Sequence, residues 1–185
     1  MAINMNKDKL KKALPYTGLP ILAGALFTMD YGEVSGFVFL QSVLLIVFGY
    51  AAAVSDLRTR RVSNGLILTM VGTWVITMAP YLFWDTGAAV VLLRDATLGF
   101  LVGGLLFMVV YIVSRKGLGL GDVKFIAVAG LYIGFANIIG AMLYGSIFAG
   151  LTALVLLLLK KIGRKDAMPL IPFLYIGILL TIFYR

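Results

Sequence analysis

The chain of 185 residues contains no cysteine and no histidine, and only 13% of its residues are charged. Without cysteine there are no disulfides and no thiolate metal sites or nucleophiles. Without histidine there are no imidazole bases or haem ligands. Any catalysis must therefore use carboxylates, hydroxyls, lysine, arginine or tyrosine. The chain has 8 Asp and Glu residues in total, few enough to consider one by one.

The low charge accompanies 62% hydrophobic residues and a mean hydropathy of +1.04, whereas soluble domains are about half apolar and about one-quarter charged. A helix that crosses a bilayer needs about 20 mostly apolar residues. Charges and turn residues delimit candidate spans at residues 14–29, 34–54, 65–84, 96–113, 123–135, 138–159 and 168–184. The sequence thus predicts an all-α, polytopic transmembrane helical bundle of about seven spans.

Two boundaries in this layout need a reason. The apolar stretch 125–159 is too long for one crossing, and its Gly-Phe-Ala-Asn segment at 134–137 favours a tight turn. The first span is short and contains Pro15, Gly18 and Pro20, which favours an irregular accessory helix. We therefore expect a basic N-terminal tail with an accessory segment at 1–33 and a six-span membrane-embedded core at 34–185.

The basic residues predict an orientation. If the N-terminus is cytoplasmic and the spans alternate, Arg94 and Arg185 alone among the 16 Lys and Arg residues fall outside. Basic residues beside membrane spans favour the cytoplasmic face. The formal charge of +8 is then mostly a topology signal. We expect a multi-pass protein of the cytoplasmic membrane that has the lipid bilayer as a partner and does not bind nucleic acid.

Two acidic residues stand apart from the rest. Asp56 lies in VSDLRTRRVSN at 54–64, where it ends the second span, and Asp122 lies in GLGLGDVK at 117–124, where it opens the fifth. The remaining acids have ordinary positions, either within lysine-rich runs (Asp8 and Asp166) or at outer helix ends (Asp30, Glu33, Asp85 and Asp95). Ionisable groups at membrane depth tend to mark functional sites, and both Asp56 and Asp122 fall near the inner face.

Structural roles are open to both carboxylates. Asp122 could accept backbone N–H bonds at a helix N-terminus, and Asp56 could pair with Arg58 or Arg60. The glycines at 117, 119 and 121 leave the backbone before Asp122 almost bare. They would let another segment come close and would make unusual φ values accessible.

Two carboxylates without histidine suit the chemistry of an aspartic protease. Carboxyls about 3 Å apart cannot both ionise, so they share one proton, and one pKa of the pair must be raised near pH 7. One carboxyl then acts as general base on a water while the other polarises the scissile carbonyl. Asp56 and Asp122 are separated by 66 residues, so the sequence does not show that they meet.

These motifs resemble the type IV prepilin peptidase family of integral-membrane aspartic proteases. GLGLGDVK contains the family's G-x-G-D signature with Asp122, and DLRTRRVSN resembles its other aspartate motif, with Ser63 in place of a proline. MPLIPFLYIG, with Pro169 and Pro172, resembles the family's last motif. The similarity runs from about Phe48 to the C-terminus and leaves the first span as an extra.

The resemblance implies that Asp56 and Asp122 are catalytic. It implies cleavage of a short basic leader from prepilin or pseudopilin precursors at the cytoplasmic face, just after a glycine that precedes a hydrophobic helix. Larger members also methylate the new N-terminus and carry paired Cys motifs. Because this chain has no Cys, we expect a peptidase-only form with no metal and no cofactor.

Several other residues near these motifs could also contribute to the site. Gly119 and Gly121 would support the Asp122 loop, and Lys124 would either tune the charge of Asp122 or reach lipid phosphate. Asn64 would cap the third span or hold the Asp56 loop. Pro169 and Pro172 would kink the last span near the site or start its helix.

Gly99 and Gly103 form a G-x-x-x-G pattern that permits close helix packing. We expect packing within the chain first, with a homo-oligomer as the alternative. Three other functions stay open. The two acids would also suit a small ion- or proton-coupled transporter or channel. A presenilin-like protease shares G-x-G-D but has a Tyr-Asp pair where Ser55 precedes Asp56 here. An inactive assembly factor is the third.

Overall fold

The computed structural model describes residues 36–114, 118–161 and 168–184, which form helices without any strand. The helices are α3 (Gly36–Thr59), α4 (Asn64–Trp84), α5 (Thr86–Val113), α6 (Leu120–Leu158) and α7 (Ile171–Phe183). The first four are long and apolar enough to cross a membrane, and α7 is shorter. The predicted helical membrane bundle is thus confirmed. The expected N-terminal tail and first span at 1–33 lie outside the described residues, so the count of seven spans stays a prediction.

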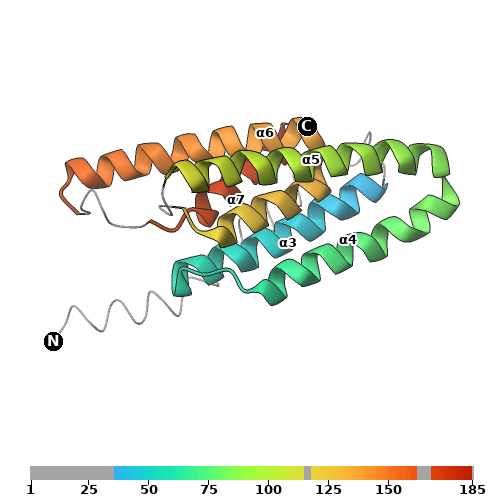
Figure 1. Cartoon of the computed structure of the whole chain (residues 1–185), viewed down its shortest axis with the longest axis horizontal. Helices are drawn as coiled ribbons and strands as arrows, with labels where there is room; N and C mark the ends of the chain where they lie inside the picture. The colour runs from blue at the N-terminus through green and yellow to red at the C-terminus, as the bar shows by residue number, and fades with distance from the viewer. Residues whose placement is uncertain (1–35, 115–117, 162–167, 185) are drawn as a thin grey trace.

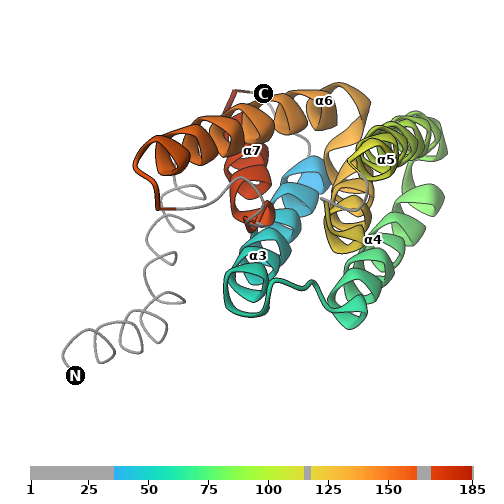
Figure 2. The same ribbon diagram turned by 60° about the vertical axis from the view of Figure 1, so that its left-hand side comes forward.

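The helix α6 bends sharply at Gly134, where φ is 78° and ψ is −178°. A Cβ atom on Gly103 of α5 would lie 3.1 Å from the carbonyl oxygen of Ile126 and 3.1 Å from Cγ1 of Ile138. In a straight helix those two residues would be about 18 Å apart, so the second half of α6 turns back beside the first. Figures 1 and 2 show this reversal, which confirms the predicted break.

Small residues allow α5 and α6 to touch through their backbones. A Cβ atom on Gly99 would overlap the carbonyl oxygen of Gly130, and one on Gly130 would overlap the carbonyl oxygen of Gly99. The G-x-x-x-G pattern therefore packs within the chain, as expected. Gly145 in the second half of α6 similarly approaches Leu174 of α7, where an added Cβ would lie 2.8 Å from the Leu174 Cα.

Several helices extend past the predicted spans. The prediction cut the fourth span at Ala96, but α5 begins at Thr86, because Asp85 Oδ1 accepts the Ala88 N–H at 3.0 Å and Arg94 and Asp95 do not break the helix.

The last helix begins at Ile171, with Pro172 as its second residue. Of the two roles considered for Pro172, starting the helix is the one observed.

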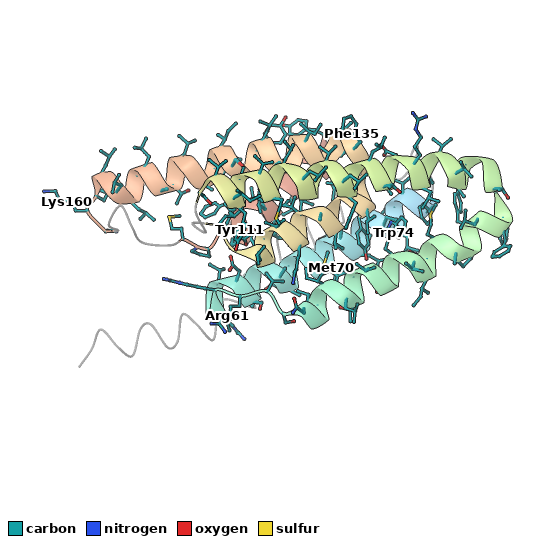
Figure 3. The ribbon with its side chains drawn as sticks, in the orientation of Figure 1. Arg61, Met70, Trp74, Tyr111, Phe135 and Lys160 are labelled. Atoms are coloured by element: carbon teal, nitrogen blue, oxygen red, sulfur yellow. The ribbon has the colours of Figure 1, made fainter. Side chains whose placement is uncertain are left out.

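The core lies where α3, α6 and α7 meet, with Leu45, Phe125 and Leu174 fully buried. Large aliphatic side chains on α4 and α5, including Leu68, Ile76 and Leu105, are exposed. Such a surface suits lipid rather than water. Arg61 and Lys160 both lie toward one end of the bundle, and Trp74 and Phe135 lie away from that end (Figure 3).

Candidate functional site

A cavity of about 410 Å³ opens at the end of the bundle where α3 ends and where α6 and α7 begin. Its walls are Asp56 and the turn after α3 (60–62), the start of α6 (118–122), and residues 168–170 ahead of α7. Asp56 and Asp122 both line this cavity. The fold therefore brings Asp56 and Asp122, the two carboxyls expected to be catalytic, into the same cavity.

Asp56 is in the last turn of α3, and its side chain is buried with 5% exposure. Its Oδ2 atom accepts a hydrogen bond from the backbone N–H of Ile171, the first residue of α7, at 3.2 Å. The N-terminus of a helix carries partial positive charge that stabilises a carboxylate. The position of Asp56 is thus fixed by α3 and by α7.

The turn after α3 is held by side-chain hydroxyls. Arg60 has φ of 53°, and its N–H donates to the Asp56 carbonyl oxygen at 2.8 Å. Ser55 Oγ and Thr59 Oγ1 donate to the Arg61 carbonyl oxygen at 2.9 and 3.1 Å. These bonds keep Arg60 and Arg61 on the cavity wall.

Asp122 is the third residue of α6 and reaches back to the start of its helix. Its Oδ2 atom accepts the Gly119 N–H at 3.1 Å, and its own N–H donates to the Gly119 carbonyl oxygen at 3.1 Å. The predicted hydrogen bonding at a helix N-terminus is observed, with Gly119 rather than Asp122 as the N-cap. This bonding engages one oxygen of the carboxyl, Oδ2, so it does not exclude a chemical role.

The glycines of this loop provide space rather than unusual backbone angles. Gly119 has φ of −81°, which any residue adopts. A Cβ atom on Gly119 would lie 3.1 Å from Asp122 Oδ2, and one on Gly121 would lie 3.4 Å from Val62 Cβ. We expect glycine here to allow either close approach of another segment or unusual φ values. The structure shows close approach.

Both carboxyls lie in end turns of their helices, α3 and α6, and outside the spans that the sequence predicts at 34–54 and 123–135. Burial and then the nearby Asp56 charge raise the pKa of Asp122 to about 6, against the opposing Gly119 N–H. Burial also raises the pKa of Asp56, while the Ile171 N–H and the Arg60 charge lower it. Two coupled acids of this kind can hold one shared proton.

Lys124 and Asn64 contact each other rather than the carboxyls. Lys124 Nζ donates to Asn64 Oδ1 at 3.0 Å, which joins the start of α6 to the start of α4. The cap of α4 is Ser63, whose Oγ accepts the Leu66 N–H at 3.1 Å. The sequence predicts that Asn64 caps the third span or holds the Asp56 loop. The observed contact instead joins α4 to α6.

Pro169 lines the cavity together with Met168 and Leu170, whereas Pro172 is not among the lining residues. The hydrogen bond from the Ile171 N–H to Asp56 could not be predicted from the sequence, because a residue of any type other than proline has a backbone N–H. Arg61 and Val62 were not predicted to line the cavity, although both belong to the VSDLRTRRVSN motif.

Comparison with known proteins gives a family but no individual relative. The model of the type IV leader peptidase family matches residues 42–154, more than half of the chain. Both Asp56 and Asp122 fall within the matched range. No curated protein and no solved structure matches the chain.

Proposed function

Because the chain belongs to the type IV leader peptidase family, we propose that it is a membrane-embedded aspartic endopeptidase that uses Asp56 and Asp122. Membership supports a leader-peptidase type of protease in general. The aspartic mechanism rests on one observation, that both carboxyls line a single cavity at one end of the bundle.

The different surroundings of Asp56 and Asp122 favour different catalytic roles for the two carboxyls. Burial raises the pKa of Asp56, but the Ile171 N–H and the Arg60 charge oppose this rise and favour its ionised form. Burial and the Asp56 charge both raise the pKa of Asp122 and favour its protonated form. Asp56 would take a proton from a water that attacks the scissile carbonyl, while Asp122 donates a hydrogen bond to the carbonyl oxygen. The proton that Asp56 took from the water then passes to the leaving amine as the tetrahedral intermediate collapses.

The proposed substrate is a prepilin or pseudopilin precursor with a short basic leader joined to a hydrophobic helix through a glycine. A cavity at the end of a membrane bundle suits a bond at the junction of a polar leader and an apolar helix. Arg60 and Arg61 on the wall would not attract a basic leader. Recognition would therefore depend on the hydrophobic helix and the glycine.

The proposed site faces the cytoplasm. The helix ends around the cavity carry Arg58, Arg60, Arg61 and Lys124, and Lys160 lies at the same end as Arg61 (Figure 3). Such a concentration of basic residues favours the inner side. The absence of cysteine supports a peptidase without the methylating activity of larger members.

The test is co-expression with a prepilin that bears a basic leader, followed by immunoblotting for the shortened product. We expect Asp56→Asn and Asp122→Asn each to abolish trimming. Asp85→Asn, the same change at a helix cap remote from the cavity, should leave it intact. Trimming by both variants would refute the aspartic mechanism. Failure of the wild-type chain on a panel of leaders would refute the proposed substrate and favour a role such as ion transport.

A further inference from the structure

The bend of α6 separates two backbone groups that a continuous helix would join. In an α-helix the Phe135 N–H would bond to the Leu131 carbonyl oxygen. Here the Phe135 N–H donates to Asp95 Oδ1 at 3.1 Å, and the Leu131 oxygen accepts Trp74 Nε1–H at 2.8 Å. The prediction that Asp95 is an ordinary acid at a helix end is therefore wrong. Asp95 lies within α5 and caps the second half of α6.

Gly134 is required at this bend. Its φ of 78° favours glycine, and any Cβ atom would overlap the Asp95 carboxylate. Neighbouring groups are also bonded, because Asn137 Nδ2 donates to the Ile133 oxygen at 2.7 Å and the Tyr132 hydroxyl donates to the Met70 oxygen at 2.6 Å. The bend is thus a specifically built polar region inside an apolar bundle.

One buried polar atom beside the bend has no hydrogen-bond partner within the part of the chain that the structure describes. Gln41 of α3 is 2% exposed, and its Nε2 donates to Thr77 Oγ1 at 2.8 Å. Its Oε1 atom accepts no hydrogen bond from any residue that the structure describes. A buried acceptor left unpaired is costly, about 1–3 kcal/mol, so native structures rarely contain one.

Gln41 lines a small cavity of about 20 Å³ between α3, α4, α5 and the bend. Asp95, Trp74 and Gly134 line the same cavity, which shares no residue with the cavity of Asp56 and Asp122. About 10–15 Å³ holds one water-sized particle. The space therefore fits a single small occupant.

The chemistry of the lining favours a cation. Among the described residues the Gln41 amide oxygen is unpaired. Asp95 adds a carboxylate to the wall, while the Trp74 N–H is already bonded. Within the described residues no basic group forms an ion pair with Asp95. The carbonyl end of the first half of α6 also points its negative dipole here. Interrupted helices with free oxygens are a known form of alkali-ion site in membranes.

We propose that this cavity binds one monovalent cation of about the size of Na⁺, with Gln41 Oε1 and the Asp95 carboxylate as side-chain ligands. Amide and carboxylate oxygens are hard ligands that suit such an ion. A single carboxylate balances one positive charge, which favours a monovalent ion over Ca²⁺ or Mg²⁺. The bound ion would hold the two halves of α6 at the bend.

Trp74 provides a direct reporter. The chain has 2 tryptophans, so Trp84→Phe leaves Trp74 as the single tryptophan. The purified full chain in detergent micelles is titrated with NaCl against choline chloride at constant ionic strength. We expect a saturable change in Trp74 emission and a rise in Tm with Na⁺ alone. Equal responses to choline, or no saturable response to Na⁺, would overturn the proposal.

The ligand variants are tested in the same background. Asp95→Asn keeps an acceptor for the Phe135 N–H but removes the charge. It should weaken Na⁺ binding about tenfold or more, the scale seen for losing a supporting group at a metal site. Asp85→Asn also alters a capping aspartate and should leave binding unchanged. If Asp95→Asn does not fold, Gln41→Met removes Oε1 at similar length and should give the same loss. An unchanged Na⁺ response in either variant would refute the site.

Discussion

The Oδ2 atom of Asp56 accepts the backbone N–H of Ile171 at 3.2 Å, although 115 residues separate them. This bond places one carboxyl of the proposed pair at the start of α7, where the helix dipole favours its ionised form. Asp122 instead accepts the N–H of Gly119, the N-cap of its own helix. The two carboxyls therefore differ in environment, which is what an acid and a base sharing one proton require.

The pH dependence of cleavage should reflect this difference. The active pair carries one proton, so activity should fall at low pH as both carboxyls protonate. It should also fall as the pH rises through the upper pKa of the pair, which the pKa of Asp122 at about 6 places near neutrality. Arg60→Gln removes a charge that lowers the pKa of Asp56. The acid limb should then move to higher pH, and less so at high salt.

This profile is measured with purified protein and a precursor peptide in micelles. Arg94→Gln, a charge-matched change in α5 away from the cavity, should leave both limbs in place. An acid limb that stays fixed in Arg60→Gln, or that moves to lower pH, would contradict the assignment of Asp56 as the carboxyl that is ionised first.

The space beside Gly119 should affect activity more than stability. A Cβ atom there would lie 3.1 Å from Asp122 Oδ2, so Gly119→Ser should displace the carboxyl while supplying a good N-cap. We expect cleavage to fall by about tenfold or more, since small misplacements of reacting groups are costly, while Tm holds or rises. Gly150→Ser is the control, because a Cβ at Gly150 meets nothing within 4 Å. Equal activity in the two variants would show that the Asp122 position is not critical.

The order of the helices, the break in α6 and the two acids of the site could be predicted because each has a local signal. Gly134 and Asn137 mark the break, and Asp56 and Asp122 interrupt otherwise apolar sequence. These signals require no knowledge of how the helices face one another.

The contacts between helices could not be predicted in the same way. A membrane helix is apolar all round, so its hydrophobic pattern does not show which side faces the protein. The bond between Asp95 and the Phe135 N–H and that between Asp56 and the Ile171 N–H depend on this facing. In both cases the donor is a backbone group, which any residue type could supply.

The contact between Lys124 and Asn64 should be structural. Lys124→Met and Asn64→Ala should each lower stability by about 1 kcal/mol, the net scale of one hydrogen bond. The double variant should lose little more than either single one, because both remove the same 3.0 Å bond. The pH profile should keep its alkaline limb in both variants, since the pKa of Asp122 is raised by burial and by Asp56. Additive losses in thermal unfolding would show that the contact is not formed, and a shifted alkaline limb would mean that Lys124 tunes Asp122.

The crossing of α5 and α6 should tolerate no side chain at Gly99. A Cβ there would overlap the Gly130 carbonyl oxygen and would lie 2.8 Å from the backbone carbon of Gly134, so the two helices must move apart. We expect Gly99→Ala to destabilise the bundle by about 1–3 kcal/mol, the usual cost of overpacking. Gly72→Ala is the matched control inside α4, where a Cβ meets nothing within 4 Å and should gain about 0.5–1 kcal/mol from the better helix former. Thermal unfolding in micelles measures both, and size-exclusion chromatography separates packing within the chain from contact between chains. A Gly99→Ala variant that keeps its Tm but changes its oligomeric state would assign this glycine pattern to a homo-oligomer instead.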